Sequence, residues 1–169
     1  MRSTVKLLGF VLTALFPVWL AEAQAPQLQR DISMKMALAI VEGASERCAT
    51  DGYTVSVVVL GRAGDLVAAL RGDGTKPHML EFARLKAYTA DTNPRDQTSL
   101  QFKKSSEERP YLKQIPGIVF IGGGVPIKWG DDVIGAVGVS GAPGEEKDEA
   151  CALAGIAKVA DALSARPRR

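Results

Sequence analysis

Histidine is almost absent from this chain, because His78 is the only one among 169 residues. Cysteine is nearly as scarce, with two residues, Cys48 and Cys151. These counts leave too few partners for a metal site built from several histidine and cysteine ligands. They also leave His78 as the only candidate base for a serine nucleophile.

Two catalytic motifs are present only in fragments. Ser140 lies in the run Gly138-Val-Ser-Gly141, but Ala142 stands where a nucleophile elbow requires glycine. The triplet 122–124 is all glycine, yet Val-Pro follows it where a phosphate-binding loop requires Lys-Ser or Lys-Thr. The residues offer no nucleophile and no acid–base pair, so they do not predict an enzyme.

A basic cluster is also missing. The net charge is +2, and the arginines gather only at the tail, residues 166–169. Nucleic-acid binding is therefore disfavoured, and we expect no nucleic-acid partner. The sequence has no internal repeat and no low-complexity segment.

The one long apolar run lies near the start, from Leu7 to Leu20, after two basic residues and before the small residues of Ala21-Glu-Ala23. This pattern predicts a signal peptide over residues 1–23, and cleavage after Ala25 fits almost as well. The run is too short for a membrane span. We therefore expect a periplasmic or secreted protein with one domain over residues 31–164 and a disordered tail at 165–169.

Hydrophobic periodicity and turn residues predict an α+β fold in which helices pack on an antiparallel sheet of five strands. The expected strands are Tyr53–Leu60, Leu66–Arg71, Ile118–Ile121, Val125–Trp129 and Val133–Ser140. The expected helices are Asp31–Ala49, Pro77–Ala90, Asp96–Ser106 and a long one that ends at Leu163. Neither face of Val133–Ser140 is charged, so we expect this strand in the centre, with its glycines admitting a close neighbour.

His78 lies in the first turn of the helix that begins at Pro77, and Phe82 falls on the same face. A helix start disfavours the imidazolium, and a neutral imidazole is the form that binds iron or zinc. Nearby cations could meet carboxylates; they are Arg71, Lys76 and Arg84. The alternative is an ordinary polar residue near a helix cap.

Two cysteines in an exported chain usually pair, so a disulfide between Cys48 and Cys151 is predicted, with two buried thiols as the alternative.

Four acidic residues lie in or next to the first turn of the last helix, where the helix dipole favours negative charge. An oxygen-ligand site for iron or calcium is the other explanation for this group, which comprises Glu145, Glu146, Asp148 and Glu149.

The chain resembles the GlcG/HbpS-like haem-binding family, which includes the C-terminal domain of PduO-type corrinoid adenosyltransferases. The matching segments are Ser56-Val-Val-Val, Gly64-Asp-Leu, Arg71-Gly-Asp-Gly, Ala83-Arg-Leu-Lys-Ala-Tyr-Thr-Ala90, Gly123-Gly-Val-Pro-Ile127 and Gly135-Ala-Val-Gly-Val-Ser-Gly141. The resemblance implies a profilin-like sandwich, homo-oligomers and, in some members, haem binding or breakdown.

Residues and resemblance together suggest an exported, homo-oligomeric haem-binding protein that serves haem sequestration, sensing or breakdown. His78 would be the axial ligand at the mouth of an apolar hollow that includes Phe82, and the three cations would pair with the propionates. One alternative is a module that binds a small organic acid or similar metabolite on a floor formed by Val133–Ser140. Another is a purely structural assembly protein.

Overall fold

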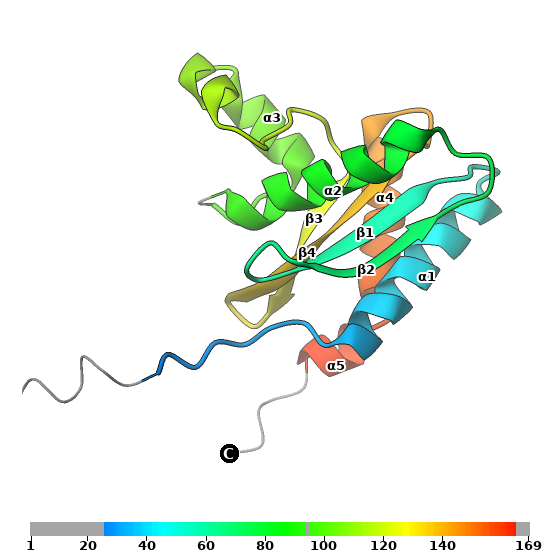
Figure 1. The fold of residues 1–169 in the computed structure, drawn as a ribbon, viewed down its shortest axis with the longest axis horizontal. Coiled ribbons are helices and arrows are strands. Elements are labelled where there is room, and N and C mark those ends of the chain that lie inside the picture. The colour runs from blue at the N-terminus through cyan, green and yellow to red at the C-terminus, as the bar shows by residue number, and fades with distance from the viewer. Residues whose placement is uncertain (1–25, 94, 165–169) are drawn as a thin grey trace, which may run out of the picture.

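The computed structural model describes residues 26–93 and 95–164. The predicted signal peptide and the arginine-rich tail lie outside these residues. The elements, in chain order, are α1 (Met34–Thr50), β1 (Ser56–Gly61), β2 (Leu66–Arg71), α2 (Pro77–Thr92), α3 (Ser99–Ser106), the 3₁₀ helix η3 (Pro110–Gln114), β3 (Gly124–Trp129), β4 (Asp132–Ser140), α4 (Glu145–Ala157) and α5 (Ala160–Ser164) (Figure 1). Within the described part, no helix has the length and apolar character needed to cross a membrane.

The strands form one antiparallel sheet in the order β2-β1-β4-β3. Every residue of β1 is buried, and so are the last seven of β4. This burial follows from the uncharged faces of both strands, and it confirms the prediction that Val133–Ser140 lies in the centre.

The expectation of a fifth strand is wrong, because the described residues form a sheet of four. Residues Ile118–Ile121 belong to no helix or strand. Instead, the Val119 amide donates a hydrogen bond to the Thr89 hydroxyl on α2, at 2.9 Å. A helix side chain thus satisfies the backbone group that a sheet ladder would otherwise have used.

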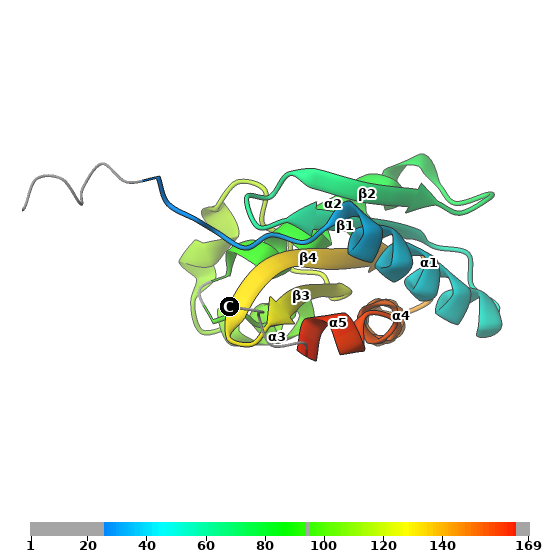
Figure 2. The same ribbon diagram turned by 90° about the horizontal axis from the view of Figure 1, so that it is seen from below.

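Helices cover both faces of the sheet (Figure 2). One cluster of buried side chains joins α1 and α4 to the face that carries Val57, Val59 and Val137. The other joins α2 to the opposite face, where its Ala83 and Ala87 pack on Val58. The α+β class is therefore confirmed, with the central strands enclosed between the two helix layers.

Helix α2 approaches β4 closely because Gly138 has no side chain. A Cβ at this position would overlap the backbone carbonyl of Ala83. The predicted close neighbour of the glycine-rich strand is therefore helix α2. Helix α2 therefore occupies the space over Gly138.

The helix ends differ from the expected ones by a few residues. α1 begins at Met34 because the Ser33 side chain accepts a hydrogen bond from the Met36 amide. α3 begins at Ser99 behind a capping box formed by Thr98 and Gln101. The long last helix is interrupted after α4 and resumes as α5.

The predicted disulfide is confirmed. Cys48 at the end of α1 bonds to Cys151 in α4, with 5.6 Å between their Cα atoms and a sequence separation of 103. Both cysteines are buried. The bridge therefore joins the two helices that cover the same face of the sheet.

Candidate functional site

The start of α2 carries the residues that the sequence pointed to. Lys76 is the N-cap residue with extended backbone, Pro77 occupies the first turn, and no side chain caps the helix. His78 and Phe82 follow one turn apart, with ring centroids 5.3 Å apart in an edge-on arrangement. The structure therefore brings these two rings together, as their spacing of four residues predicts.

His78 is exposed, and Phe82 is 36% exposed. Both rings thus reach the surface of the chain at the start of α2. One hollow of the described surface, about 350 Å³, lies between segment 27–30, Arg62 and Asp132. Another, about 230 Å³, lies between α1 and α4. Neither borders His78.

The three candidate cations differ in their surroundings. Arg84 forms two hydrogen bonds to Glu81, at 2.9 and 2.7 Å. This contact raises the pKa of Arg84 and lowers that of Glu81, so the guanidinium already has a carboxylate partner. Arg71 donates to the Thr75 carbonyl at 2.6 Å, and Lys76 is exposed. Arg71 and Lys76 thus remain better placed than Arg84 to receive an anion.

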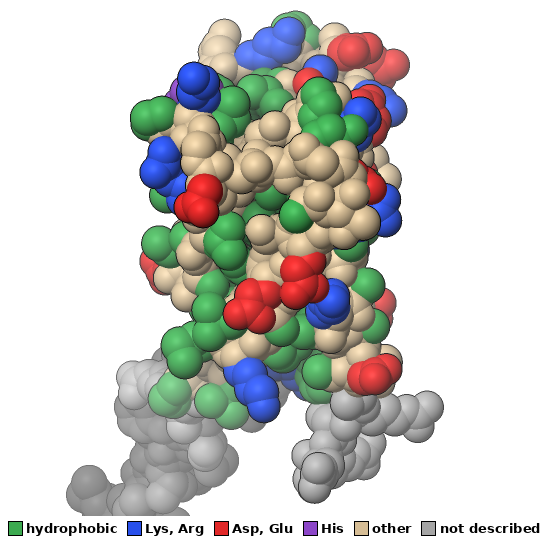
Figure 3. Space-filling model, turned by 90° about the vertical axis from the view of Figure 1, so that its right-hand side faces the viewer, with side chains coloured by type: hydrophobic (Ala, Val, Ile, Leu, Met, Phe, Trp, Pro, Cys, Tyr) green, Lys and Arg blue, Asp and Glu red, His purple; other side chains and the backbone are tan. Residues whose placement is uncertain are grey.

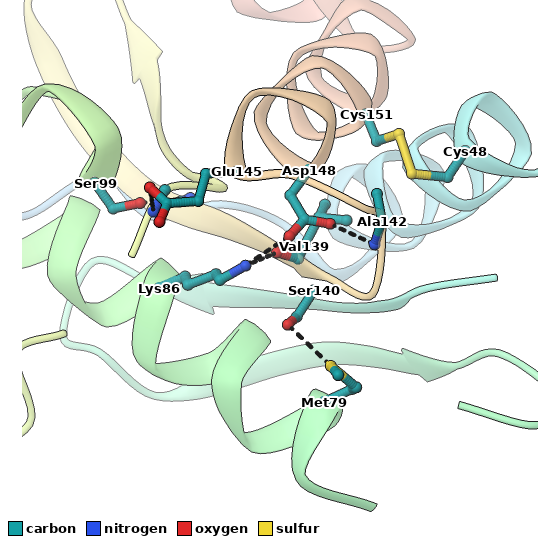
Figure 4. A network of polar contacts seen from close by, with 12 residues as sticks. Cys48, Met79, Lys86, Ser99, Val139, Ser140, Ala142, Glu145, Asp148 and Cys151 are labelled. Carbon is teal, nitrogen blue, oxygen red and sulfur yellow. Dashed lines mark hydrogen bonds and ion pairs between the residues drawn. A yellow bond between two sulfur atoms is a disulfide. The ribbon is translucent and has the colours of Figure 1, made fainter. Parts of the chain in front are cut away.

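A polar layer beneath the first turn of α2 fixes its position on the sheet. Ser56 and Ser140 are paired residues of β1 and β4, and both are buried. The Ser56 hydroxyl contacts the Thr75 hydroxyl at 3.2 Å. The Ser140 hydroxyl donates to the Met79 sulfur at 3.4 Å (Figure 4). Thr75 precedes His78 in the chain and Met79 follows it. Their contacts with β1 and β4 therefore hold the first turn of α2 against the sheet.

A buried ion pair lies further along α2, and sequence reasoning missed it. Lys86 donates to Asp148 of α4 at 2.7 Å and to the Val139 carbonyl at 3.0 Å (Figure 4). Asp148 also accepts a hydrogen bond from the Ala142 amide at 3.0 Å. The side chains of Lys86 and Asp148 are 3% and 5% exposed. Burial raises the pKa of Asp148, while Lys86 and the Ala142 amide oppose that change.

The glycine triplet passes beside this ion pair. The Gly122 amide donates to Glu145 at 3.0 Å, and the Gly124 amide donates to the Ser99 hydroxyl at 2.8 Å. Gly123 has a φ of +112°, and a Cβ there would fall 2.7 Å from that of Asp148. These contacts explain the triplet as a tightly packed turn in which the amides of Gly122 and Gly124 already have protein partners.

The acidic residues of α4 are directed to different partners. Glu145 pairs with Lys103 at 2.7 Å, whereas Asp148 points inward to Lys86. Within residues 26–93 and 95–164, no three His, Cys, Asp or Glu side chains are grouped so that they could hold a metal ion. The oxygen-ligand explanation for this cluster is therefore wrong.

Asp91, in the last turn of α2, predicts a pH-dependent stability. Burial, followed by the nearby Asp31, raises the pKa of Asp91 to about 6, and Arg62 opposes the shift. A raised carboxyl pKa stabilises the fold below pH 3.8, and that stability is lost as the pH rises through 6. Since Asp91 is half-buried, the loss should be about 1 kcal/mol.

The substitution Asp91→Asn should remove that loss. The variant should be more stable than the parent at pH 7.5 by about 1 kcal/mol and nearly equal to it near pH 4. Urea titrations across this range measure the difference. Asp131→Asn, in the exposed turn between β3 and β4, is the matched control and should leave the pH profile unchanged. Parallel profiles for Asp91→Asn and the parent would contradict the prediction.

Comparison with known proteins gives a consistent set of relatives. The family model described as "Haem degrading protein HbpS-like" matches residues 32–157. Protein GlcG of Escherichia coli strain K12 is 30% identical over 109 residues, which cover 64% of this chain and 81% of GlcG.

Solved structures agree with these matches. A crystal structure of HbpS aligns with a TM-score of 0.75 and 34% identity, over 80% of this chain and 94% of that one. A double mutant of HbpS from Streptomyces reticuli aligns with a TM-score of 0.74 and 31% identity, over 88% and 97%. A haem complex of PduOC shares the fold, with a TM-score of 0.67 and 21% identity, over 76% of this chain and 94% of that one.

Proposed function

Because this chain belongs to the HbpS-like family, we propose that it is an exported haem-binding protein in which His78 is the axial ligand. The observation that carries the proposal is the exposed imidazole at the start of α2, set edge-on against Phe82. Neutral imidazole is a common axial ligand of haem iron, and the phenyl ring offers apolar surface to the porphyrin beside it.

The positive charge near His78 could bind the propionate carboxylates of haem. Lys76 is exposed and Arg71 keeps further N–H donors beyond the one given to Thr75. The uncapped amides at the helix start add partial positive charge. Propionate carboxylates placed here would meet two cations and a helix N-terminus. Arg84 is the weaker candidate, because Glu81 holds its guanidinium.

The open position of His78 has a consequence for affinity. Haem bound here would keep one face exposed within a single copy, so it should exchange readily and pass to a stronger acceptor. Such behaviour fits sequestration or sensing. The family description names haem degradation, and the same bound haem would be its substrate. Export is proposed from the amino-terminal sequence and agrees with the disulfide, since disulfides persist in oxidising compartments.

Haem titration tests the ligand directly, because His78 is the chain's only histidine. The parent protein should shift the Soret band of haem, and His78→Ala should lose that shift and bind at least about tenfold more weakly. Phe82→Leu should weaken binding less, since an apolar side chain remains. Tyr111→Ala removes an exposed aromatic on η3, away from the site, and should bind as the parent does.

The results that would overturn the proposal are equally clear. If the spectrum of haem were unchanged by the parent protein, haem binding would be refuted. If His78→Ala gave the parent's spectrum and affinity, the assignment of the ligand would be refuted. A thermal-shift screen with small carboxylates, run beside free haem, separates the haem proposal from an organic-acid module.

A further inference from the structure

The hollow of about 350 Å³ lies at the end of the sheet opposite to the proposed haem site. Its walls are segment 27–30, Arg62 in the turn between β1 and β2, and Asp132 at the start of β4. Strand β2 runs from this turn towards the loop that leads to α2 and His78 (Figure 1). Figure 3 faces that other end, where acidic, basic and apolar side chains are interspersed. The volume of the hollow is that of a site for a small molecule.

Short contacts hold the walls of this hollow in place. The Ile32 amide donates to the Ile134 carbonyl of β4 at 3.0 Å, so the segment before α1 lies against the sheet. Arg30 forms an ion pair with Asp132, and its guanidinium carbon lies 4.2 Å from the centre of the Trp129 ring. Walls that are ordered before a ligand arrives reduce the entropy lost on binding.

Arg62 supplies the available positive charge of the hollow. Its backbone amide donates to Asp31 at 3.0 Å, and its Nη1 atom donates to the Val133 carbonyl at 2.9 Å. Its charge opposes the raised pKa of Asp91. Its guanidinium nevertheless forms no ion pair within residues 26–93 and 95–164. A guanidinium has several N–H donors, so Arg62 keeps donors for a carboxylate while the Val133 contact orients it.

The other groups of the hollow offer an acceptor, a donor and an apolar surface. Asp132 accepts from Arg30 through its Oδ2 atom, and its Oδ1 atom takes no hydrogen bond from any described residue. The Gln29 amide donates to Gln27 Oε1 at 3.3 Å, and the amide nitrogen of Gln27 remains a donor. Leu28 is 97% exposed beside them. A ligand that fits these groups carries a negative charge, a hydrogen-bond donor close to it, and an apolar part.

We propose that this hollow binds a small carboxylate with an α-amino or α-hydroxyl group and an apolar side chain. Arg62 binds the carboxylate through two of its N–H groups. The Oδ1 atom of Asp132 accepts a hydrogen bond from the α group, and the apolar side chain contacts Leu28. The site shares no residue with the proposed haem site, so neither proposal depends on the other.

Three compounds of matched shape test the proposal on protein without haem. L-leucine carries an α-amino group, α-hydroxyisocaproate carries an α-hydroxyl group, and isocaproate has neither. Amide NMR spectra recorded during each titration measure binding and locate it. At least one of the first two should shift the amide signals of Arg62 and Asp132 but not that of His78, and isocaproate should bind more weakly. The tighter of the first two identifies the α group as ammonium or hydroxyl.

Substitutions at the hollow test the two contacts separately. Arg62→Gln should weaken binding of each compound at least about tenfold, because hydrogen bonds between charged groups are lost. Arg95→Gln, at an exposed position in the turn after α2, is the matched control and should bind as the parent does. Asp132→Asn should weaken binding of the α-substituted compounds relative to isocaproate. His78→Ala should bind all three as the parent does, which separates this site from the haem site.

The same spectra show whether each variant is folded, and Asp132→Asn keeps the test decisive if Arg62→Gln is not. The absence of shifts at Arg62 and Asp132 with all three compounds would overturn the proposal. So would binding that Arg62→Gln leaves unchanged, or an isocaproate affinity equal to those of the α-substituted compounds. A carboxylate found in the thermal-shift screen belongs to this hollow if its effect is lost in Arg62→Gln and kept in His78→Ala.

Discussion

Lys86→Met is expected to reduce the free energy of unfolding by about 3–5 kcal/mol, because it leaves the buried carboxylate of Asp148 without its cation. The ion pair is 2.7 Å long and both side chains are almost completely buried. Asp148 would retain only the Ala142 amide as a partner. Since burial already raises the pKa of Asp148, the variant should recover stability as the pH falls and the carboxyl takes up a proton.

Lys103→Met is the matched control for this prediction. Its ion pair with Glu145 has the same length of 2.7 Å, but the two side chains are 40% and 29% exposed. Solvent screening should limit its loss to less than about 1 kcal/mol. Urea unfolding of both variants measures the contrast. Equal losses would contradict the argument that burial determines the cost.

The double variant Lys86→Met/Asp148→Leu completes the test. Removing both charges together leaves no unpaired ion, so most of the lost stability should return. A double variant as unstable as Lys86→Met would mean that packing around Gly123, rather than charge, dominates this region. The cycle therefore separates the electrostatic contribution from the steric one.

The buried pair shows where sequence reasoning stops. Lys86 lies on α2 among the buried residues Ala83, Ala87 and Ala90. A lysine on such a face is a signal that a partner must exist inside. The sequence could not name Asp148, because the helix dipole already explained an acid in that turn. Only the packing of α2 against β4 and α4 identifies the partner.

Much of the fold could be predicted because it depends on local patterns. The uncharged faces of β4 indicated its central place, and its glycines indicated a close neighbour, which the structure identifies as α2 at Gly138. The error at Ile118–Ile121 has the opposite cause. Its apolar pattern is typical of a strand, but the Thr89 hydroxyl takes the amide of Val119. A contact between residues thirty positions apart leaves no trace in a local pattern.

The sequence predicted how the candidate residues are spaced along α2, but not the surface around them. The spacing of His78 and Phe82 correctly predicted that the rings meet. Nothing in the sequence indicated that the rings would lie on an open surface. Likewise, Arg84 looked as free as Lys76, although Glu81 three residues earlier was a visible competitor. The spacing of residues along one helix could thus be predicted from the sequence. The shape of the surface around that helix could not, because it depends on how distant parts of the chain pack.

Removing the disulfide should have an effect of similar size to breaking the buried ion pair. The bond closes a loop of 103 residues, and chain entropy alone gives about 4–5 kcal/mol for a loop of that length. The double variant Cys48→Ala/Cys151→Ala should therefore unfold at least about 10 °C below the parent under non-reducing conditions. Calorimetry of both proteins measures the difference.

Reductant separates the crosslink from the packing of the two side chains. With excess reductant, the parent should lose stability and approach the double variant, while the double variant should not change. A remaining gap would measure the packing lost when the buried sulfurs are removed. If reductant left the melting of the parent unchanged, and its unfolded chain showed two free thiols without reduction, the bond between α1 and α4 would not exist in solution. Helix α1 would then be held by its apolar contacts with the sheet and α4 and by the exposed ion pair of Glu46 with Lys158.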